Sequence, residues 1–339
     1  MSISRIIRRS FEITWDYRAL WLFGFILALT TPGGGGGNGG GGSGGGGSSF
    51  TAPAGMASKI SLPLSQMDDG VMIALAIGMA ILALLVSIGF TIARVVAETA
   101  IIRMVDGYEA SGVRVSVSQG FRLGWSRGAL RIFLIDLLVS LAAMVGIALL
   151  LGIAAAPLLL WTLNNEALGI LGTVFSILLG IPALIIVIVG IIGLVILVQF
   201  FHRAAVLEER GAIESLRRGW QVARQRLGET LLLGVTLFAI GLGISLVLLP
   251  LFFLLLMVGG TLAGLPGLLA GLLTSLFAQG AAPWVVGLIF AFPIFLAVVI
   301  VPALFASGLF QVFTSSAWTL AYRDLLGLAS PAAIAEPAA

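Results

Sequence analysis

Long apolar runs separated by short polar segments make up most of the chain. A helix needs roughly 20 apolar residues to cross a hydrocarbon layer of about 30 Å, and several runs reach that length without a charge. The pattern predicts six membrane spans, at residues 19–29, 71–93, 137–161, 168–201, 231–258 and 284–310. A seventh apolar stretch, 262–277, contains Pro266 and several glycines. We expect it to be an interfacial or re-entrant piece on the outer side.

Short amphipathic segments precede three of these spans. In the first, apolar side chains recur every fourth residue and so share one helix face: Ile3, Ile7, Phe11 and Trp15. A corresponding stripe occurs later in the chain: Ile213, Leu216, Trp220 and Leu227. Arginines occupy the other faces. Such a helix is typical of the membrane interface, where guanidinium groups reach toward phosphates.

A five-residue cluster recurs at residues 7–11, 121–125 and 216–220. A shift of 95 positions takes Arg122 to Arg217 and Trp125 to Trp220. Each copy also begins with a residue suited to start a helix. Ser116 and Gln119 have capping-box spacing in the second copy, and Gly211 and Ser2 are acceptable caps at the corresponding positions of the other two. We therefore predict an all-α integral membrane protein with six transmembrane helices in three parallel repeats, each with an amphipathic interfacial elbow helix. The repeat units run about 1–110, 111–210 and 211–326, within one transmembrane domain, 1–326.

Composition agrees with this class, because 59% of the 339 residues are hydrophobic and only 10% are charged. Cysteine is absent, so disulfides and thiolate metal sites are excluded. Arginines cluster before the first span, between the second and third, and between the fourth and fifth. Since basic residues in short loops stay cytoplasmic, the sequence predicts a multi-pass membrane protein with both termini in the cytoplasm. If 262–277 crossed instead, the carboxyl end would lie outside.

Two segments are predicted to be disordered. Residues 32–56 form a glycine-rich loop, in which 13 of the 15 residues from Gly33 to Gly47 are glycine. The loop lacks the strand and helix that a phosphate-binding loop requires, so we interpret it as an extracytoplasmic tether. Residues 327–339 are expected to be a cytoplasmic tail.

The elbow segments supply the candidate sites for lipid or partner binding. Each basic residue near an anionic leaflet contributes roughly 1 kcal/mol. The candidates are Arg8, Arg9, Arg122, Trp125, Arg217, Arg218 and Trp220. The alternative is that these arginines only orient the protein. By this charge argument, the expected partners are anionic membrane lipids and a protein partner in a membrane complex; no nucleic acid is expected.

A second group of ionisable residues lies near the predicted inner boundary, where pairing with elbow arginines is expected. The group is Arg94, Glu98, Arg131, Asp136, Arg226 and Glu229. His202 is the only histidine and is interpreted as a structural interfacial residue. The middle thirds of the spans carry no acid, base or amide, which argues against a proton relay or ion pore. We predict neither a catalytic residue nor a metal site nor a cofactor.

Three stretches carry a family resemblance: residues 9–24, residues 206–220 and the closing Trp318-Thr-Leu-Ala-Tyr-Arg323. They resemble a broad family of prokaryotic multi-pass proteins that is similar to the membrane domain of some glycerophosphodiester phosphodiesterases. Most stand-alone members have no assigned function. The resemblance implies that the chain lies in the inner membrane of a prokaryotic cell. The chain lacks a soluble phosphodiesterase domain, so the resemblance implies a membrane module that anchors or assists something else, without hydrolase activity.

Two functions remain open at this point. The first is a non-catalytic scaffold or accessory subunit whose arginine-rich cytoplasmic elbows bind anionic lipid or a partner protein. The alternative is a carrier or lipid-handling protein that moves an apolar or amphipathic molecule through a groove, with Asp136 and Glu229 near its inner mouth.

Overall fold

The computed structural model describes residues 2–31, 69–163 and 165–328, and these form helices joined by short turns, without a strand. The predicted loop 32–56 lies outside the described residues, as does most of the predicted tail 327–339. The helices, in chain order, are α1 (Ile3–Asp16), α2 (Ala19–Thr30), α4 (Asp69–Ser111), α5 (Val117–Gly124), α6 (Arg127–Ala155), η2 (Ala156–Leu163), α7 (Glu166–Leu207), α8 (Ala212–Gln225), α9 (Leu227–Ser275), α10 (Ala282–Phe295), η3 (Leu296–Ile300) and α11 (Val301–Leu325).

Within the described residues, five helical segments are long and apolar enough to cross a membrane: Ile73–Ser111, Arg127–Leu163, Glu166–Leu207, Leu227–Ser275 and Ala282–Leu325. Helix α2 is apolar but shorter, with 12 residues. Large apolar side chains stay exposed along these segments. Exposure of this extent would be very costly in water, whereas hydrocarbon can cover it. The fold is therefore that of an all-helical multi-pass membrane protein.

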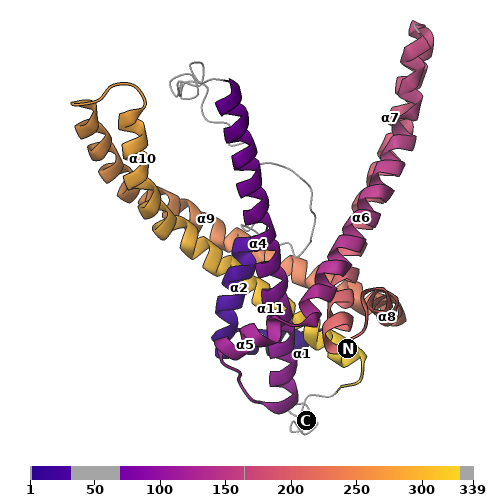
Figure 1. The fold of residues 1–339 in the computed structure, drawn as a ribbon. Coiled ribbons are helices and arrows are strands. Elements are labelled where there is room, and N and C mark those ends of the chain that lie inside the picture. The colour runs from indigo at the N-terminus through magenta and orange to yellow at the C-terminus, as the bar shows by residue number, and fades with distance from the viewer. Residues whose placement is uncertain (1, 32–68, 164, 329–339) are drawn as a thin grey trace.

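Three apolar arms rise from one base (Figure 1). One arm pairs α9 with α10, another pairs α6 with α7, and the amino-terminal half of α4 forms the third. The arms diverge, while both described ends of the chain lie at the base.

The packed core lies in the base. Its buried side chains come from α1, α2, α4, α7, α8, α9 and α11 and from the α1–α2 turn, and they include Ile13, Tyr17, Leu20, Phe23, Ile101, Met104, Phe200, Val222, Leu233, Val312 and Tyr322. At one crossing within it, α2 meets α11 without intervening side chains. A Cβ on Gly24 would lie 2.5 Å from the carbonyl oxygen of Gly308, so only glycine permits this approach.

The amphipathic helices that the sequence predicted each pack on a long helix at the base: α1 on α11, α5 on α4 and α8 on α7. Small residues make these contacts. A Cβ on Gly124 would lie 2.5 Å from the carbonyl oxygen of Val96, and one on Gly219 would lie 2.6 Å from the Phe201 ring. Ser10 is buried at the corresponding place in α1. The predicted capping box of Ser116 and Gln119 is confirmed, and Ser2 and Gly211 are the N-caps of α1 and α8.

Residues 262–277 do not form a piece of their own in the structure. Helix α9 continues unbroken through Pro250 and Pro266 to Ser275, so this stretch is not a separate piece. Its glycines are contact points with α10: a Cβ on Gly267 would lie 2.8 Å from both the Gly287 carbonyl oxygen and the Ala291 Cβ. Close packing of small residues on a neighbouring helix compensates for the helix-breaking tendency of proline and glycine.

Candidate functional site

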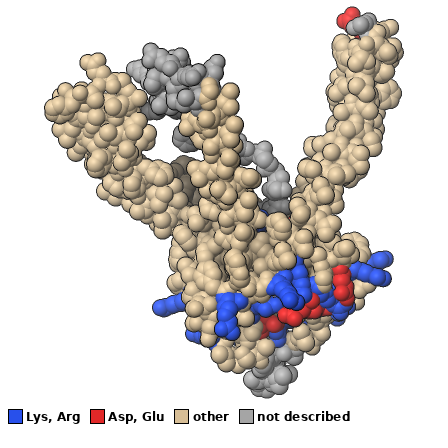
Figure 2. All heavy atoms as spheres, in the orientation of Figure 1, with Lys and Arg blue, Asp and Glu red and all other residues tan. Residues whose placement is uncertain are grey.

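On the face that Figure 2 shows, charged side chains gather in a belt across the base, while the arms are almost free of them. Acidic and basic groups lie next to each other within the belt. Among the described residues, Glu166 is an exception: it lies at the far end of the α6–α7 arm, at the start of α7. The chemistry of the described chain is therefore concentrated at the base.

On α1, α5 and α8, one exposed arginine is followed three residues later by an exposed aromatic ring on the helix or at its C-cap. The pairs are Arg8 with Phe11, Arg122 with Trp125, and Arg217 with Trp220. The aromatic residues are 61%, 72% and 47% exposed. Arg8 bonds only to its helical neighbour Glu12, at 3.2 Å. Within the described chain, Arg122 and Arg217 form no ion pair. We call these six residues the collar.

Arg9 and Arg218, which the sequence grouped with the collar, instead turn inward. Arg9 donates to Glu109 at the end of α4, at 2.7 Å, and Arg218 donates to Glu208 just after α7, at 3.2 Å. Burial opposes the charge on Arg9, but the hydrogen bond and the charge of Glu109 outweigh it and raise the pKa of Arg9. These two arginines therefore connect α1 to α4 and α8 to the end of α7.

Glu208 is a junction of three elements. It accepts hydrogen bonds from Arg210, at 2.7 Å, from Arg218 on α8, and from the Tyr322 hydroxyl on α11, at 2.5 Å. Burial alone would raise the pKa of Glu208, but these donors stabilise the carboxylate more and lower it.

A buried cluster lies where α4, α6 and α7 meet. His202 on α7 is almost fully buried, with its Nδ1 atom 2.7 Å from Glu98 on α4 and its Nε2 atom 2.8 Å from Asp136 on α6. We call these three residues the histidine cluster. One imidazole ring thus joins two carboxyl groups from different helices.

The two contacts of the histidine cluster determine how many protons it holds. Each short nitrogen–oxygen contact needs one proton between the two atoms. An imidazolium with two carboxylates meets this requirement, and so does a neutral imidazole with one carboxylate and one carboxylic acid. Both states hold two protons and carry one net negative charge. Removing either proton would break one contact.

Arg203 follows His202 and is also buried. Its guanidinium donates to the Gln199 side chain at 2.7 Å and to the Ser315 carbonyl at 3.1 Å on α11. Its Nε atom has no partner among the described residues. Arg203 therefore places a positive charge beside the negative histidine cluster, which favours both in a buried setting.

The remaining residues predicted to lie near the inner membrane boundary have different kinds of partner. Glu229 pairs with Arg226 at 3.2 Å, as expected from elbow pairing. Asp136 was expected to pair with an elbow arginine but bonds to His202, and Arg131 instead donates to the carbonyl of Ala205. Arg94 lies one turn before Glu98 on α4. The partners of His202 were not predicted, because they are distant in sequence. Its position directly after a long charge-free run was the available signal.

No group of three or more histidine, cysteine, aspartate or glutamate side chains in the described chain is arranged to hold a metal ion. In the histidine cluster the two carboxyl groups lie at different nitrogens of one ring, so they bind the ring instead of converging on an ion.

Long apolar helices, a charged base and a buried ionic cluster define a multi-pass membrane protein. The chain belongs to a family of unknown function, DUF7544, whose profile matches residues 9–321. No curated protein and no solved structure matches the chain. These comparisons do not link it to the membrane domains of glycerophosphodiester phosphodiesterases.

Proposed function

We propose that this protein is a non-catalytic membrane scaffold whose collar binds anionic lipid headgroups at the cytoplasmic face of the cell membrane. The observation that carries the proposal is the threefold exposed pair of arginine and aromatic ring on α1, α5 and α8. Arginine reaches phosphate oxygens with several donors, and aromatic rings favour the headgroup level.

The proposed topology has six spans in three parallel repeats, each opening with an elbow helix, and both termini are cytoplasmic. Support comes from the order of elements, since α1, α5 and α8 each precede two apolar helical segments. Further support comes from the packing, in which α5 and α8 contact the long helix before them while α1 contacts α11. The arginine-rich belt at the base agrees with cytoplasmic placement.

A partner protein fits the same proposal. The resemblance to membrane domains that accompany another activity supports a module that acts beside a second protein, held near the collar. The carrier alternative has less support. It expects Asp136 and Glu229 to lie near the inner mouth of one groove, but Asp136 is bonded to His202 and Glu229 to Arg226.

The test replaces Arg8, Arg122 and Arg217 with glutamine together. At roughly 1 kcal/mol for each basic residue, the loss of three should weaken phosphatidylglycerol binding about 100-fold. Native mass spectrometry of the purified protein, titrated with phosphatidylglycerol, measures this. Arg9 and Arg218 must stay, because their internal ion pairs support the fold.

The matched control replaces the same three arginines with lysine, which keeps the charge and should keep most of the binding. Equal phosphatidylglycerol binding by the glutamine and lysine variants would overturn the lipid proposal. Loss of a co-purified stoichiometric protein in the glutamine variant, with lipid binding unchanged, would identify the collar as a protein-binding surface instead.

A further inference from the structure

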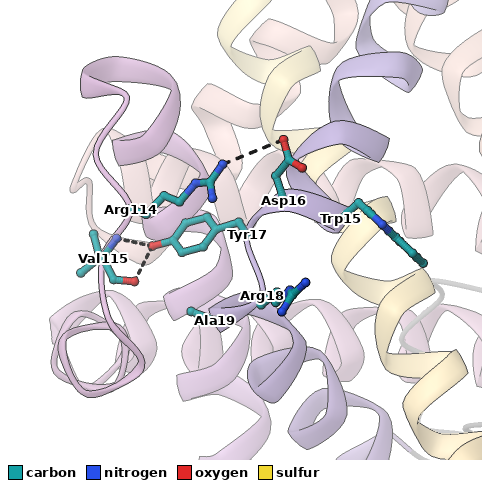
Figure 3. Close-up of a pocket in the computed structure, with 7 residues that line it drawn as sticks. All are labelled: Trp15, Asp16, Tyr17, Arg18, Ala19, Arg114 and Val115. Atoms are coloured by element: carbon teal, nitrogen blue, oxygen red, sulfur yellow. Dashed lines mark hydrogen bonds and ion pairs between the residues drawn. The ribbon is translucent and has the colours of Figure 1, made fainter.

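A hollow of ≈ 500 Å³ lies in the base, between the α1–α2 turn and the segment that follows α4 (Figure 3). The residues that line it are Trp15, Asp16, Tyr17, Arg18, Ala19, Arg114 and Val115. None of them belongs to the collar or to the histidine cluster. Two stretches about 100 residues apart in sequence therefore build this hollow.

The wall of the hollow is held firmly. The buried Tyr17 hydroxyl donates to the Val115 carbonyl at 2.8 Å and accepts from the Val115 amide at 2.6 Å. Burial raises the pKa of Tyr17 and keeps the hydroxyl neutral, so that it can serve as donor and acceptor at once. This pair of bonds ties the 112–116 segment to the turn, as Figure 3 shows.

Three charged groups border the hollow: the guanidinium groups of Arg18 and Arg114 and the carboxylate of Asp16. Arg114 and Asp16 form a long ion pair, marked by a dashed line in Figure 3. The two charged groups are 3.9 Å apart, beyond hydrogen-bond distance, and their side chains are 53% and 59% exposed. Aromatic rings position both cations: the Arg114 guanidinium lies 5.7 Å from the Tyr108 ring centre, and that of Arg18 lies 5.9 Å from Trp21. The aromatic rings therefore hold Arg18 and Arg114 in place, while the exposed Arg114 and Asp16 groups can still bind a ligand.

We propose that this hollow binds a phospholipid headgroup that carries both a phosphodiester and a primary ammonium group. The two guanidinium groups suit the phosphodiester, since arginine binds its oxygens through several donors. The Asp16 carboxylate accepts hydrogen bonds from the ammonium group. The exposed Trp15 indole at the rim suits the boundary between headgroup and acyl chain. This inference rests on the proposed function, which places the base at the headgroup layer.

Competition between lipids tests the proposal. The purified protein is offered phosphatidylethanolamine, phosphatidylcholine and phosphatidylglycerol in native mass spectrometry. A trimethylated ammonium cannot donate a hydrogen bond to Asp16, so we expect about a tenfold preference for phosphatidylethanolamine over phosphatidylcholine. Asp16→Asn should abolish this preference and leave phosphatidylglycerol binding unchanged. Arg114→Gln should weaken both ethanolamine and choline lipids.

The matched control is Glu214→Gln, which removes an exposed acid from a different part of the base and should keep the preference. Unfolding temperatures in detergent show whether each variant is folded. Competition by soluble glycerophosphoethanolamine, which has the same phosphodiester and ammonium groups without acyl chains, is also measured. Competition at equal concentration would support the same headgroup chemistry with a soluble source, while weak competition would support a lipid source.

Equal binding of the ethanolamine and choline lipids by the unaltered protein would overturn the proposal, and so would a preference that survives in Asp16→Asn. A result that overturns lipid binding by the collar is distinguishable from these outcomes. In that case the glutamine variant of Arg8, Arg122 and Arg217 retains phosphatidylglycerol, whatever Asp16→Asn does to the ethanolamine preference.

Discussion

Glu208 shows how a single residue can serve three helices. It is the C-cap of α7, where the negative end of the helix dipole disfavours a carboxylate. Glu209 follows it with a φ of 52°, a left-handed conformation that is uncommon for a residue other than glycine. This strained end is maintained because Arg210, Arg218 and Tyr322 all donate to the Glu208 carboxylate.

The lowered pKa of Glu208 predicts acid sensitivity. A carboxyl group with a lowered folded-state pKa contributes stability above its ordinary value of about 4.3, and this contribution is lost as the pH falls through the folded-state value. The unfolding temperature in detergent, followed from pH 7 to pH 3, should therefore fall less steeply in Glu208→Gln than in the unaltered protein. Glu208→Gln should also be less stable at pH 7.

Glu166→Gln is the control for Glu208, because that carboxyl group lies at the arm tip, away from the junction. It should leave the acid profile unchanged. An acid profile in Glu208→Gln equal to that of the unaltered protein would show that other groups govern the sensitivity.

At the scale of helices, the histidine cluster joins α4 to the α6–α7 pair, from which α4 diverges above the base. Helices α4, α6 and α7 meet near the base, and His202 supplies the polar link among them. Arg203 extends the link to α11. A buried ionic network of this kind specifies which helices meet, because each group requires its partner to stay buried.

Replacing His202 with alanine should lower the free energy of unfolding by about 3–5 kcal/mol, because Glu98 is left buried without its partner. Glu98→Gln should cost less, since its amide oxygen can still accept a hydrogen bond. Arg226→Gln is the control: it removes an exposed pair worth at most about 1 kcal/mol. Denaturant unfolding in detergent measures all three, and a His202→Ala variant as stable as Arg226→Gln would contradict a structural role for the cluster.

At the scale of the whole molecule, the arms are longer than a membrane is thick. Helix α9 has 49 residues, which at 1.5 Å each gives about 73 Å against a hydrocarbon layer of about 30 Å. A long apolar helix adapts by tilting or kinking. The divergence of the arms in Figure 1 agrees with tilt, and Pro250 and Pro266 provide places for a bend in α9.

The proposed topology predicts which residues face each side of the membrane. Because the chain has no cysteine, single cysteines can be introduced at Glu166 and Phe277, near two arm tips, and at Arg122 and Arg217 in the base. A membrane-impermeant maleimide applied to intact cells should label the first two only. Labelling of the base cysteines should require permeabilised cells.

The labelling also separates the two topologies considered for α9. If the position of Phe277 is labelled from the same side as that of Arg122, residues 262–277 do not reach the outer face and the six-span proposal is wrong. Equal labelling of all four cysteines after permeabilisation is the control for accessibility.

Local pattern in the sequence determined where the helices lie, because hydrophobic periodicity and capping residues act over a few positions. Ser116 with Gln119 marked the start of α5, and the apolar runs marked the long helices. Tertiary structure alone decided which of two adjacent arginines faces outward, as for Arg217 and Arg218, since that depends on Glu208 across a packed interface. It also decided that His202 meets Glu98 and Asp136, which are 104 and 66 residues away, because contacts at such separations arise from the packing of helices and leave no periodic signal.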